Sequence, residues 1–283
     1  MPFIIHRHRR LWYQDVGSGF PLLFGHGFLW DRKMWQPQIE ILSQHYRCIV
    51  PDLWSHGASE SVPQRPYSIE LLSKDFYYLM DKLNLPEFAV IGQSISGMWG
   101  AQLSLNHANA VKALIMMDTF VGEEPIERKL MYSEILHSWE HKQHLSDEII
   151  EKILPFFFTP STFHTKPELI KDFKTKLKQL PVEQIEGLIE IGHTIFSRRS
   201  ILDKLGLLKM PVLIMVGEND YPRPIHEAET MARYIPHAKL KIIADSGHVP
   251  SVEQPEIVTK ILQNFLSEAL ADIVIPAKIM DKV

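Results

Sequence analysis

A strand-like apolar run that breaks at a glycine and passes directly into a helix-like pattern constrains the fold of this chain most. Residues 88–91 are Phe-Ala-Val-Ile, Gly92 follows, and helix-like periodicity begins after Ser94. A serine on such a tight strand-to-helix turn takes backbone angles that most residues avoid, and small neighbours let the turn close. The following helix directs its first amide groups and positive dipole end to the same spot. Ser94 is therefore a candidate nucleophile.

Two later segments supply groups that would activate a serine. A serine hydroxyl is a weak nucleophile until a base takes its proton, and the base needs a third group to orient it. Residues 210–220 form a strand-like run that ends in Asp220, and residues 240–248 form another that is broken by glycine just before His248. Such positions lie at the carboxyl ends of parallel strands, where α/β sheets bind ligands. The order Ser94, Asp220, His248 is the order expected of a catalytic triad on an α/β-hydrolase sheet.

The acid of this triad has a rival. Asp118 ends another strand-like run, residues 111–117, and an acid there can reach the same histidine or can merely cap the following loop. We take Asp220 as the acid and interpret Asp245 as a turn former. Among the 14 histidines of the chain, His248 is preferred because it follows Ser-Gly at a strand end.

Strand-like and helix-like segments alternate along most of the chain. This alternation predicts an α/β fold with a mostly parallel central sheet that helices cover on both faces. The strand-like runs fall near residues 3–7, 11–15, 21–25, 47–51, 88–92, 111–117, 211–216 and 239–244, and the helix-like periods fill 69–84, 95–107, 225–234 and 254–270.

The segment from residue 121 to 200 breaks the alternation with amphipathic helical stretches, several prolines and no convincing strand. We expect it to form a helical cap inserted after the sixth strand. The predicted core domain is then residues 1–120 and 201–271, and residues 272–283 form a tail of unknown role. The run Phe156, Phe157 and Phe158 is the strongest apolar feature of the cap. We favour packing over substrate contact for this run, although different rings could do both.

Composition and charge exclude several other classes of protein. With 283 residues, 45% of them hydrophobic, the chain can bury a large core. Its formal net charge of −4 suggests neither a nucleic-acid partner nor a membrane surface. Cys48 is the single cysteine, so there is no disulfide framework, and no apolar stretch approaches the ~20 residues of a membrane span. The amino terminus lacks the pattern of a signal peptide, and we expect a cytoplasmic protein. No motif for a metal or cofactor is present, and none is expected.

With these motifs the chain resembles the α/β-hydrolase fold family over nearly its whole length. Residues 22–27, Leu-Leu-Phe-Gly-His-Gly, look like the strand and turn that carry half of the oxyanion hole. Residues 51–59 resemble the family's Asp-Leu-x-Gly-His-Gly-x-Ser loop, and residues 252–255 are similar to its Glu-x-Pro after the histidine. The overall pattern is closest to small serine hydrolases of the 3-oxoadipate enol-lactonase-like group, with acyl-homoserine lactonase-like esterases also near.

The chain also departs from the family pattern. The usual nucleophile turn has glycine where this chain has Ser96, and we expect the helix-to-strand packing to survive this small substitute. The residues after His-Gly are Phe28, Leu29 and Trp30, not the Gly-Pro-Gly often seen in carbon–carbon bond hydrolases. A serine at position 94, where dehalogenases and epoxide hydrolases have aspartate, counts against those chemistries.

The resemblance implies roles for further residues. The backbone amides of Phe28 and Ile95 would form the oxyanion hole. His26 and His56 are expected to fix turns and are left out of the catalytic set. Trp30 joins the three cap phenylalanines as a candidate for the substrate pocket.

Together these features predict a serine hydrolase that cleaves a carboxylic ester or lactone of a small, apolar substrate through an acyl-enzyme. The expected partner is that small molecule alone. A small-molecule receptor with slow or no turnover remains an alternative, as do a thioesterase, a carbon–carbon bond hydrolase and a perhydrolase, because the fold alone does not choose among them.

Overall fold

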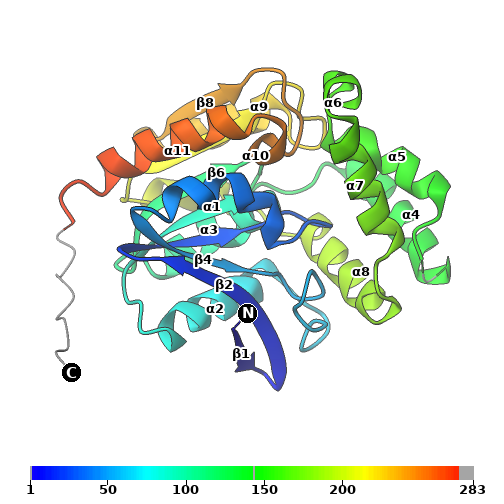
Figure 1. The fold of residues 1–283 in the computed structure, drawn as a ribbon, viewed down its shortest axis with the longest axis horizontal. Helices are drawn as coiled ribbons and strands as arrows, with labels where there is room; N and C mark the ends of the chain where they lie inside the picture. Colours follow the sequence, from blue (N-terminus) through cyan, green and yellow to red (C-terminus); the bar gives the residue numbers. More distant parts are fainter. Residues whose placement is uncertain (1, 143, 274–283) are drawn as a thin grey trace.

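We describe residues 2–142 and 144–273 in a computed structural model of the chain (Figure 1). The described residues form an eight-stranded sheet in the order β1-β2-β4-β3-β5-β6-β7-β8. The pairs β1–β2 and β2–β4 are antiparallel, and all the other pairs are parallel. The strands are β1 (Phe3–His6), β2 (Arg9–Gly17), β3 (Phe20–Gly25), β4 (Tyr46–Pro51), β5 (Phe88–Gln93), β6 (Val111–Met117), β7 (Val212–Gly217) and β8 (Lys239–Ile243).

The central strands are continuous apolar runs because both of their faces are buried. Every residue of β5 and of β7 is buried. Successive side chains of a strand point to opposite faces, and the core accordingly divides into two clusters. Leu22 and Phe24 belong to the cluster beneath α1 and α11, whereas Leu23 belongs to the cluster beneath α2, α3 and α9. The fold class expected from the sequence is confirmed.

Helices cover both faces of the sheet. The sequence pattern located α2 (Ile69–Lys82), α3 (Ile95–Asn106), α9 (Ile225–Tyr234) and α11 (Pro255–Ala269) to within about two residues. It missed the 3-10 helix η1 (Arg32–Trp35), α1 (Gln36–Leu42), the 3-10 helix η2 (Leu202–Leu207) and α10 (Pro250–Glu253). The four are too short to show a helical period, and α10 occupies what the sequence suggested was a loop.

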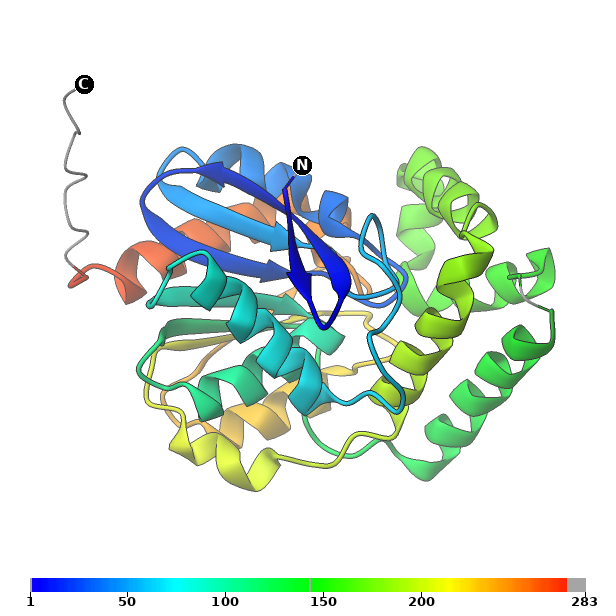
Figure 2. The ribbon, with the colours of Figure 1, turned by 90° about the horizontal axis from the view of Figure 1, so that it is seen from below.

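The segment between β6 and β7 is helical, as the sequence predicted. Its helices are α4 (Ile126–Lys142), α5 (Asp147–Phe157), α6 (Pro160–Thr165), α7 (Pro167–Lys178) and α8 (Val182–Phe196). Figures 1 and 2 show these helices, in green to yellow-green, gathered at one end of the sheet. Side chains cap the N-termini of two of these helices. The Ser146 side chain accepts a hydrogen bond from the Ile149 amide at the start of α5, and the Thr159 side chain accepts one from the Thr162 amide at the start of α6. The helical cap inserted after the sixth strand is confirmed.

Three predictions about organisation stay predictions. These are the domain boundaries at residues 120, 201 and 271, the cytoplasmic location, and the absence of nucleic-acid and membrane partners. Of the predicted tail, residues 274–283 lie outside the described residues. Within residues 2–142 and 144–273, none of the helices combines the length and apolar character needed to cross a membrane.

Candidate active site

Ser94 lies in a strained turn at the carboxyl end of β5. Its backbone angles are φ 56° and ψ −121°, outside the common regions for a residue with a side chain. The turn closes because position 92 is glycine, since a Cβ there would lie 2.2 Å from the Ser96 carbonyl oxygen. Two hydrogen bonds hold the turn, from the Ser94 amide to the Met117 carbonyl (2.8 Å) and from the Thr119 hydroxyl to the Ser94 carbonyl (2.7 Å). The sequence expectation for this turn is met by its geometry.

The structure brings Ser94, His248 and Asp220 into one chain of hydrogen bonds. His248 Nε2 lies 3.0 Å from Ser94 Oγ, and His248 Nδ1 lies 3.0 and 2.9 Å from the two carboxylate oxygens of Asp220. A carboxylate can only accept, so Nδ1 carries the proton and the Nε2 lone pair faces the serine hydroxyl. All three residues are buried, and they follow β5, β8 and β7.

Asp118, the rival acid, lies nearby without a hydrogen bond to the histidine. Its Oδ1 accepts from the Gly217 amide at 2.8 Å, and its Oδ2 has no hydrogen-bond partner within the described part of the chain. Burial, reinforced by the neighbouring Asp220, holds the pKa of Asp118 well above its ordinary value. The neutral form of Asp118 is therefore favoured beside Asp220.

The amides expected to form the oxyanion hole lie on two neighbouring loops. Ile95 is the first residue of α3, and Phe28 follows β3. No hydrogen bond among residues 2–142 and 144–273 uses either amide, so both are available to an oxyanion. A hydrogen bond of the next residue fixes the Phe28 loop, because the Leu29 amide donates to His56 Nε2 at 3.1 Å.

His26 and His56 act as fixed acceptors in these turns. The Leu53 amide donates to His26 Nε2 at 2.9 Å, and each ring directs Nδ1 at a backbone carbonyl, at 2.8 Å in both cases. Burial lowers the pKa of His26 to about 4 and lowers that of His56 well below its ordinary value. Both rings are neutral near pH 7, which agrees with the turn-fixing role expected from the sequence.

Ser96, which replaces the glycine usual in the family, fits the turn, and its hydroxyl makes two hydrogen bonds. Gly25 leaves space for it, since a Cβ on Gly25 would lie 2.5 Å from Ser96 Cβ. The Ser96 hydroxyl donates to the His26 carbonyl at 2.6 Å and accepts from Trp99 Nε1 at 3.0 Å. The hydroxyl therefore ties the nucleophile turn to the loop that carries Phe28.

Two side chains fix the histidine loop, and motif analysis did not assign either of them a role. Gln93 Nε2 donates to the His248 carbonyl at 2.6 Å. Glu253 accepts from the amides of Gly247 (2.7 Å) and Thr159 (3.0 Å), and so joins the histidine loop to the cap. The Glu-x-Pro pattern located Glu253, but its contact with the cap has no signal in the sequence.

A cavity of about 90 Å³ opens beside Ser94 and His248, under the cap. Most of its lining is apolar and comes from α4, α5 and the end of α8. The lining residues are Phe28, Leu29, Ser94, Tyr132, Ile135, Leu136, Trp139, Leu145, Ile153, Phe156, Phe157, Ile195, Phe196, Pro222, Arg223 and His248.

The residues expected in the pocket divide between two places. Phe156 and Phe157 line the cavity, whereas Trp30 and Phe158 are not part of its lining. Trp30 instead stacks on Phe173 of α7 with ring centroids 4.5 Å apart, and Phe158 packs edge-on against the same ring at 5.5 Å. Phe157 belongs to both places, because it lines the cavity and also packs edge-on against Phe173 at 4.9 Å.

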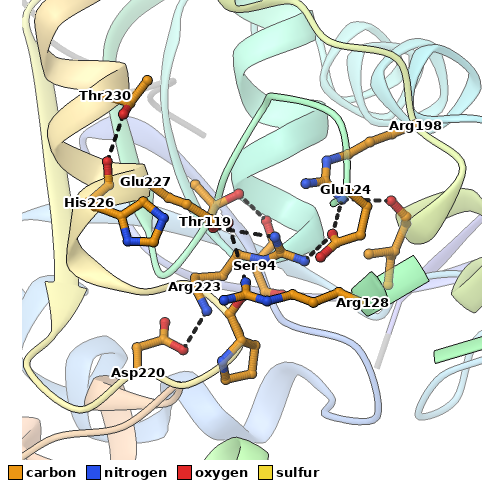
Figure 3. Close-up of polar contacts among 12 residues, drawn as sticks. Ser94, Thr119, Glu124, Arg128, Arg198, Asp220, Arg223, His226, Glu227 and Thr230 are labelled. Atoms are coloured by element: carbon orange, nitrogen blue, oxygen red, sulfur yellow. Dashed lines mark hydrogen bonds and ion pairs between the residues drawn. The ribbon is translucent and has the colours of Figure 1, made fainter. Parts of the chain in front are cut away.

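A buried cluster of charges lies beside the acid loop (Figure 3). Arg223 donates to Glu124 and to Glu227, and its amide donates to Asp220 Oδ1 at 3.0 Å. Arg198, just after α8, donates to Glu124 at 2.7 Å. Burial acts to raise the pKa of Glu124, but Arg223 and Arg198 outweigh burial and hold this pKa below its ordinary value. The cluster thus joins both ends of the cap to the loop of Asp220.

Asp118, Asp220 and His248 also place potential ligand atoms within 4.8 Å of one another. Asp220 and His248 are already satisfied by their mutual hydrogen bonds, and the remaining free oxygen of Asp118 is one ligand atom only. The hydrogen-bonded arrangement accounts for the cluster without an ion.

Comparison with known proteins shows the family of the chain. The model of the alpha/beta hydrolase fold matches residues 21–255. The chain belongs to the alpha/beta hydrolase fold family. This α/β hydrolase is 25% identical in sequence to 3-oxoadipate enol-lactonase 2 of Acinetobacter baylyi, over 89% of this chain and 94% of that protein. The predicted family and the prediction of a hydrolytic enzyme are confirmed.

Solved structures of other α/β hydrolases have the same fold. A thermophilic esterase from Thermogutta terrifontis is 30% identical, with a TM-score of 0.84 over 92% of this chain and 94% of that one. Est816, described as an N-acyl homoserine lactone degrading enzyme, is 23% identical, with a TM-score of 0.78 over 93% of this chain and 100% of that one. At that identity the second likeness concerns the fold alone.

Proposed function

We propose that this α/β hydrolase is a serine hydrolase that cleaves a small carboxylic ester or lactone. The observation that carries the proposal is the continuous hydrogen-bond chain from Ser94 through His248 to Asp220, at the wall of an apolar cavity. The names of its relatives, an enol-lactonase and an esterase, support the ester or lactone bond as the one cleaved.

In the proposed reaction, His248 Nε2 takes the hydroxyl proton as Ser94 Oγ attacks the carbonyl carbon. The carbonyl oxygen becomes an oxyanion that the amides of Phe28 and Ile95 stabilise, each donor lowering the barrier by roughly 2.7–4 kcal/mol. The C–O bond to the alcohol then breaks, and His248 gives its proton to the leaving oxygen. Water repeats these steps on the acyl-enzyme, while Asp220 holds the ring and stabilises its charged form.

The cavity supports a small, apolar group on the substrate. Its volume of about 90 Å³ is less than that of a cavity of about 150 Å³ that holds benzene in an engineered protein. Aromatic and aliphatic side chains of the cap form most of the lining, and such a lining favours an apolar group on the substrate. We therefore expect short acyl chains to be preferred, with a small molecule as the partner of this chain.

The test is the initial rate of hydrolysis by wild type and by Ser94→Ala. The panel is p-nitrophenyl esters of rising chain length, thioesters, enol-lactones and homoserine lactones. We expect multiple turnovers of short esters or lactones, and a loss of about 10⁶-fold in kcat in Ser94→Ala. Equal rates in the two proteins would contradict the nucleophile. A single slow turnover by wild type would indicate a receptor, and a thioester as best substrate would indicate a thioesterase.

A further inference from the structure

Few polar groups line the cavity apart from Ser94 and His248. They are Tyr132 and Trp139 from α4, and Arg223 from the acid loop. Arg223 already donates to two glutamates. Its guanidinium therefore serves the buried charge cluster.

Trp139 gives no clear indication of a ligand. Its indole N–H is buried and has no partner in the described part of the chain. The same is true of Trp30 and Trp35, which are not among the residues that line the cavity. An unpartnered indole is therefore common in this protein and does not mark the cavity.

Tyr132 differs from these tryptophans. Among the residues described, no other tyrosine hydroxyl is both buried and unpartnered. Its ring is held in place by Phe196, stacked with centroids 4.1 Å apart, and by Phe156, edge-on at 6.0 Å. Both neighbours line the cavity as well. The ring is therefore fixed in the wall of the site, and its hydroxyl is buried at the end of that ring.

The hydroxyl of Tyr132 acts as a donor at every working pH. Burial raises the pKa of Tyr132 to about 12, so the proton stays on the oxygen. A buried donor without an acceptor costs stability, and folded proteins retain few of them. The ring lies in the wall of a cavity beside a nucleophile, so a substrate whose binding opens the wall at the hydroxyl can offer the acceptor.

We propose that Tyr132 donates a hydrogen bond to an oxygen on the apolar part of the substrate. The preferred substrate class is then a small ester or lactone whose acyl or alkyl group carries an ether, keto or hydroxyl oxygen. This inference rests on the proposed function. A site built around such a donor discriminates against the analogue that lacks the oxygen, because the donor is then left buried and unpaired.

The test uses pairs of esters in which one oxygen replaces one methylene, so that length and volume stay matched. On the acyl side the pairs are p-nitrophenyl butanoate with methoxyacetate, and pentanoate with 3-methoxypropanoate. On the alcohol side the pair is butyl acetate with 2-methoxyethyl acetate. For each pair we take the ratio of kcat/KM, oxygen over methylene, in wild type and in Tyr132→Phe. Dividing the wild-type ratio by the Tyr132→Phe ratio cancels the difference in intrinsic reactivity between the two esters of a pair.

We expect the ratio of kcat/KM, oxygen ester over methylene ester, to be about tenfold lower in Tyr132→Phe than in wild type for at least one pair. A change of about tenfold corresponds to one net hydrogen bond. The melting temperature of Tyr132→Phe, compared with that of wild type, shows whether the variant is folded, and the ratio itself does not depend on the absolute rates. Tyr77→Phe is the matched control, because Tyr77 lies on α2 and stacks on His107, away from the cavity. Its ratio should equal that of wild type. Unchanged ratios in Tyr132→Phe for all three pairs would overturn the inference.

A binding measurement separates this inference from the proposed function. Ser94→Ala cannot turn substrate over, so the rise in its melting temperature with each acetate ester reports binding. We expect 2-methoxyethyl acetate to stabilise Ser94→Ala more than butyl acetate does, and the difference to vanish in Ser94→Ala/Tyr132→Phe. Turnover without a pair difference overturns the role of Tyr132 alone. Failure to cleave any ester or lactone of the panel overturns the proposed function, while the binding difference can still be measured.

Discussion

The two walls of the cavity are built from different interactions. On the sheet side, hydrogen bonds of about 3 Å fix Ser94, His248 and Asp220 at the ends of three strands. On the cap side, the contacts are between rings and aliphatic groups of α4, α5 and α8, such as Tyr132 on Phe196. Hydrogen bonds demand particular residue types, whereas apolar packing accepts many. Chemistry is therefore fixed on the sheet side, and substrate choice can vary on the cap side.

The sharpest test of the sheet side separates its two acids. In Asp220→Asn the histidine loses the acceptor that sets its tautomer, and we expect kcat for a short ester to fall about 10⁴-fold. In Asp118→Asn the side chain stays neutral, as it is favoured to be in the wild type, and we expect a loss of less than about tenfold. Steady-state kinetics with p-nitrophenyl butanoate gives both values. A larger loss in Asp118→Asn would show that the acid has been misassigned.

Gly27→Ala tests whether the Phe28 loop must hold its place. A Cβ at position 27 would lie 2.0 Å from Gln93 Oε1, so either the Gln93 amide leaves the His248 carbonyl or the loop shifts and carries the Phe28 amide with it. We expect a loss of about 10²–10³-fold in kcat, the cost of one misplaced oxyanion donor. The control is Gly27→Ala combined with Gln93→Ala, which removes the colliding atoms. Its rate should match that of Gln93→Ala alone, and a further loss in the double variant would argue against the collision.

On the cap side, Phe156→Ala should change substrate choice and leave the chemistry intact. Removing a ring from the lining enlarges the cavity, and a methylene in an apolar pocket is worth about tenfold or more in kcat/KM. We expect the ratio of hexanoate to butanoate hydrolysis to rise about tenfold, with acetate unchanged within about threefold. Phe158→Ala is the matched control, because Phe158 packs on Phe173 outside the lining. An equal shift in Phe158→Ala would contradict the division of the three phenylalanines.

The smallest expected effect concerns stability and pH. Because the pKa of Asp118 is raised in the folded protein, the folded state keeps a proton that the unfolded chain releases above about pH 4. Wild type should therefore lose stability relative to Asp118→Asn as the pH rises from about 4 through the raised pKa. Melting temperatures of the two proteins from pH 4 to pH 8 provide the measurement. A difference that stays constant over this range would show that Asp118 is not perturbed.

The sheet side could be predicted residue by residue because its signals are local. Ser94, Asp220 and His248 each follow an apolar run that ends near a glycine, and their order in the chain agrees with one fold. The sequence does not separate Asp220 from Asp118, since both follow parallel strands. Only the folded geometry shows which carboxylate reaches the ring. The roles of Gln93 and Gly27 also depend on contacts across the turn that no motif records.

The cap side could be predicted only as helical. An amphipathic pattern separates buried from exposed residues, but it does not tell whether a buried ring faces a cavity or another helix. Phe157 and Phe158 are neighbours in sequence and both pack on Phe173, but Phe157 also lines the cavity, whereas Phe158 is not part of its lining. Tyr132 carries no signal of its own in α4. The ion pair of Arg223 with Glu124 joins residues 99 positions apart, and its formation depends on the path of the whole cap.

The contacts between the cap and the histidine loop limit how the cap could be exchanged between enzymes. The His248 amide donates to the Phe157 carbonyl at 2.9 Å, and Glu253 binds both the Thr159 amide and the Thr162 hydroxyl. A chimera that replaces α4 and the end of α8 would leave these bonds intact. One that replaces the whole insertion would remove the backbone support of the histidine. For the design of new specificities, the transferable module is therefore α4 with the end of α8, and the stretch from Phe157 to Thr162 belongs with the catalytic scaffold.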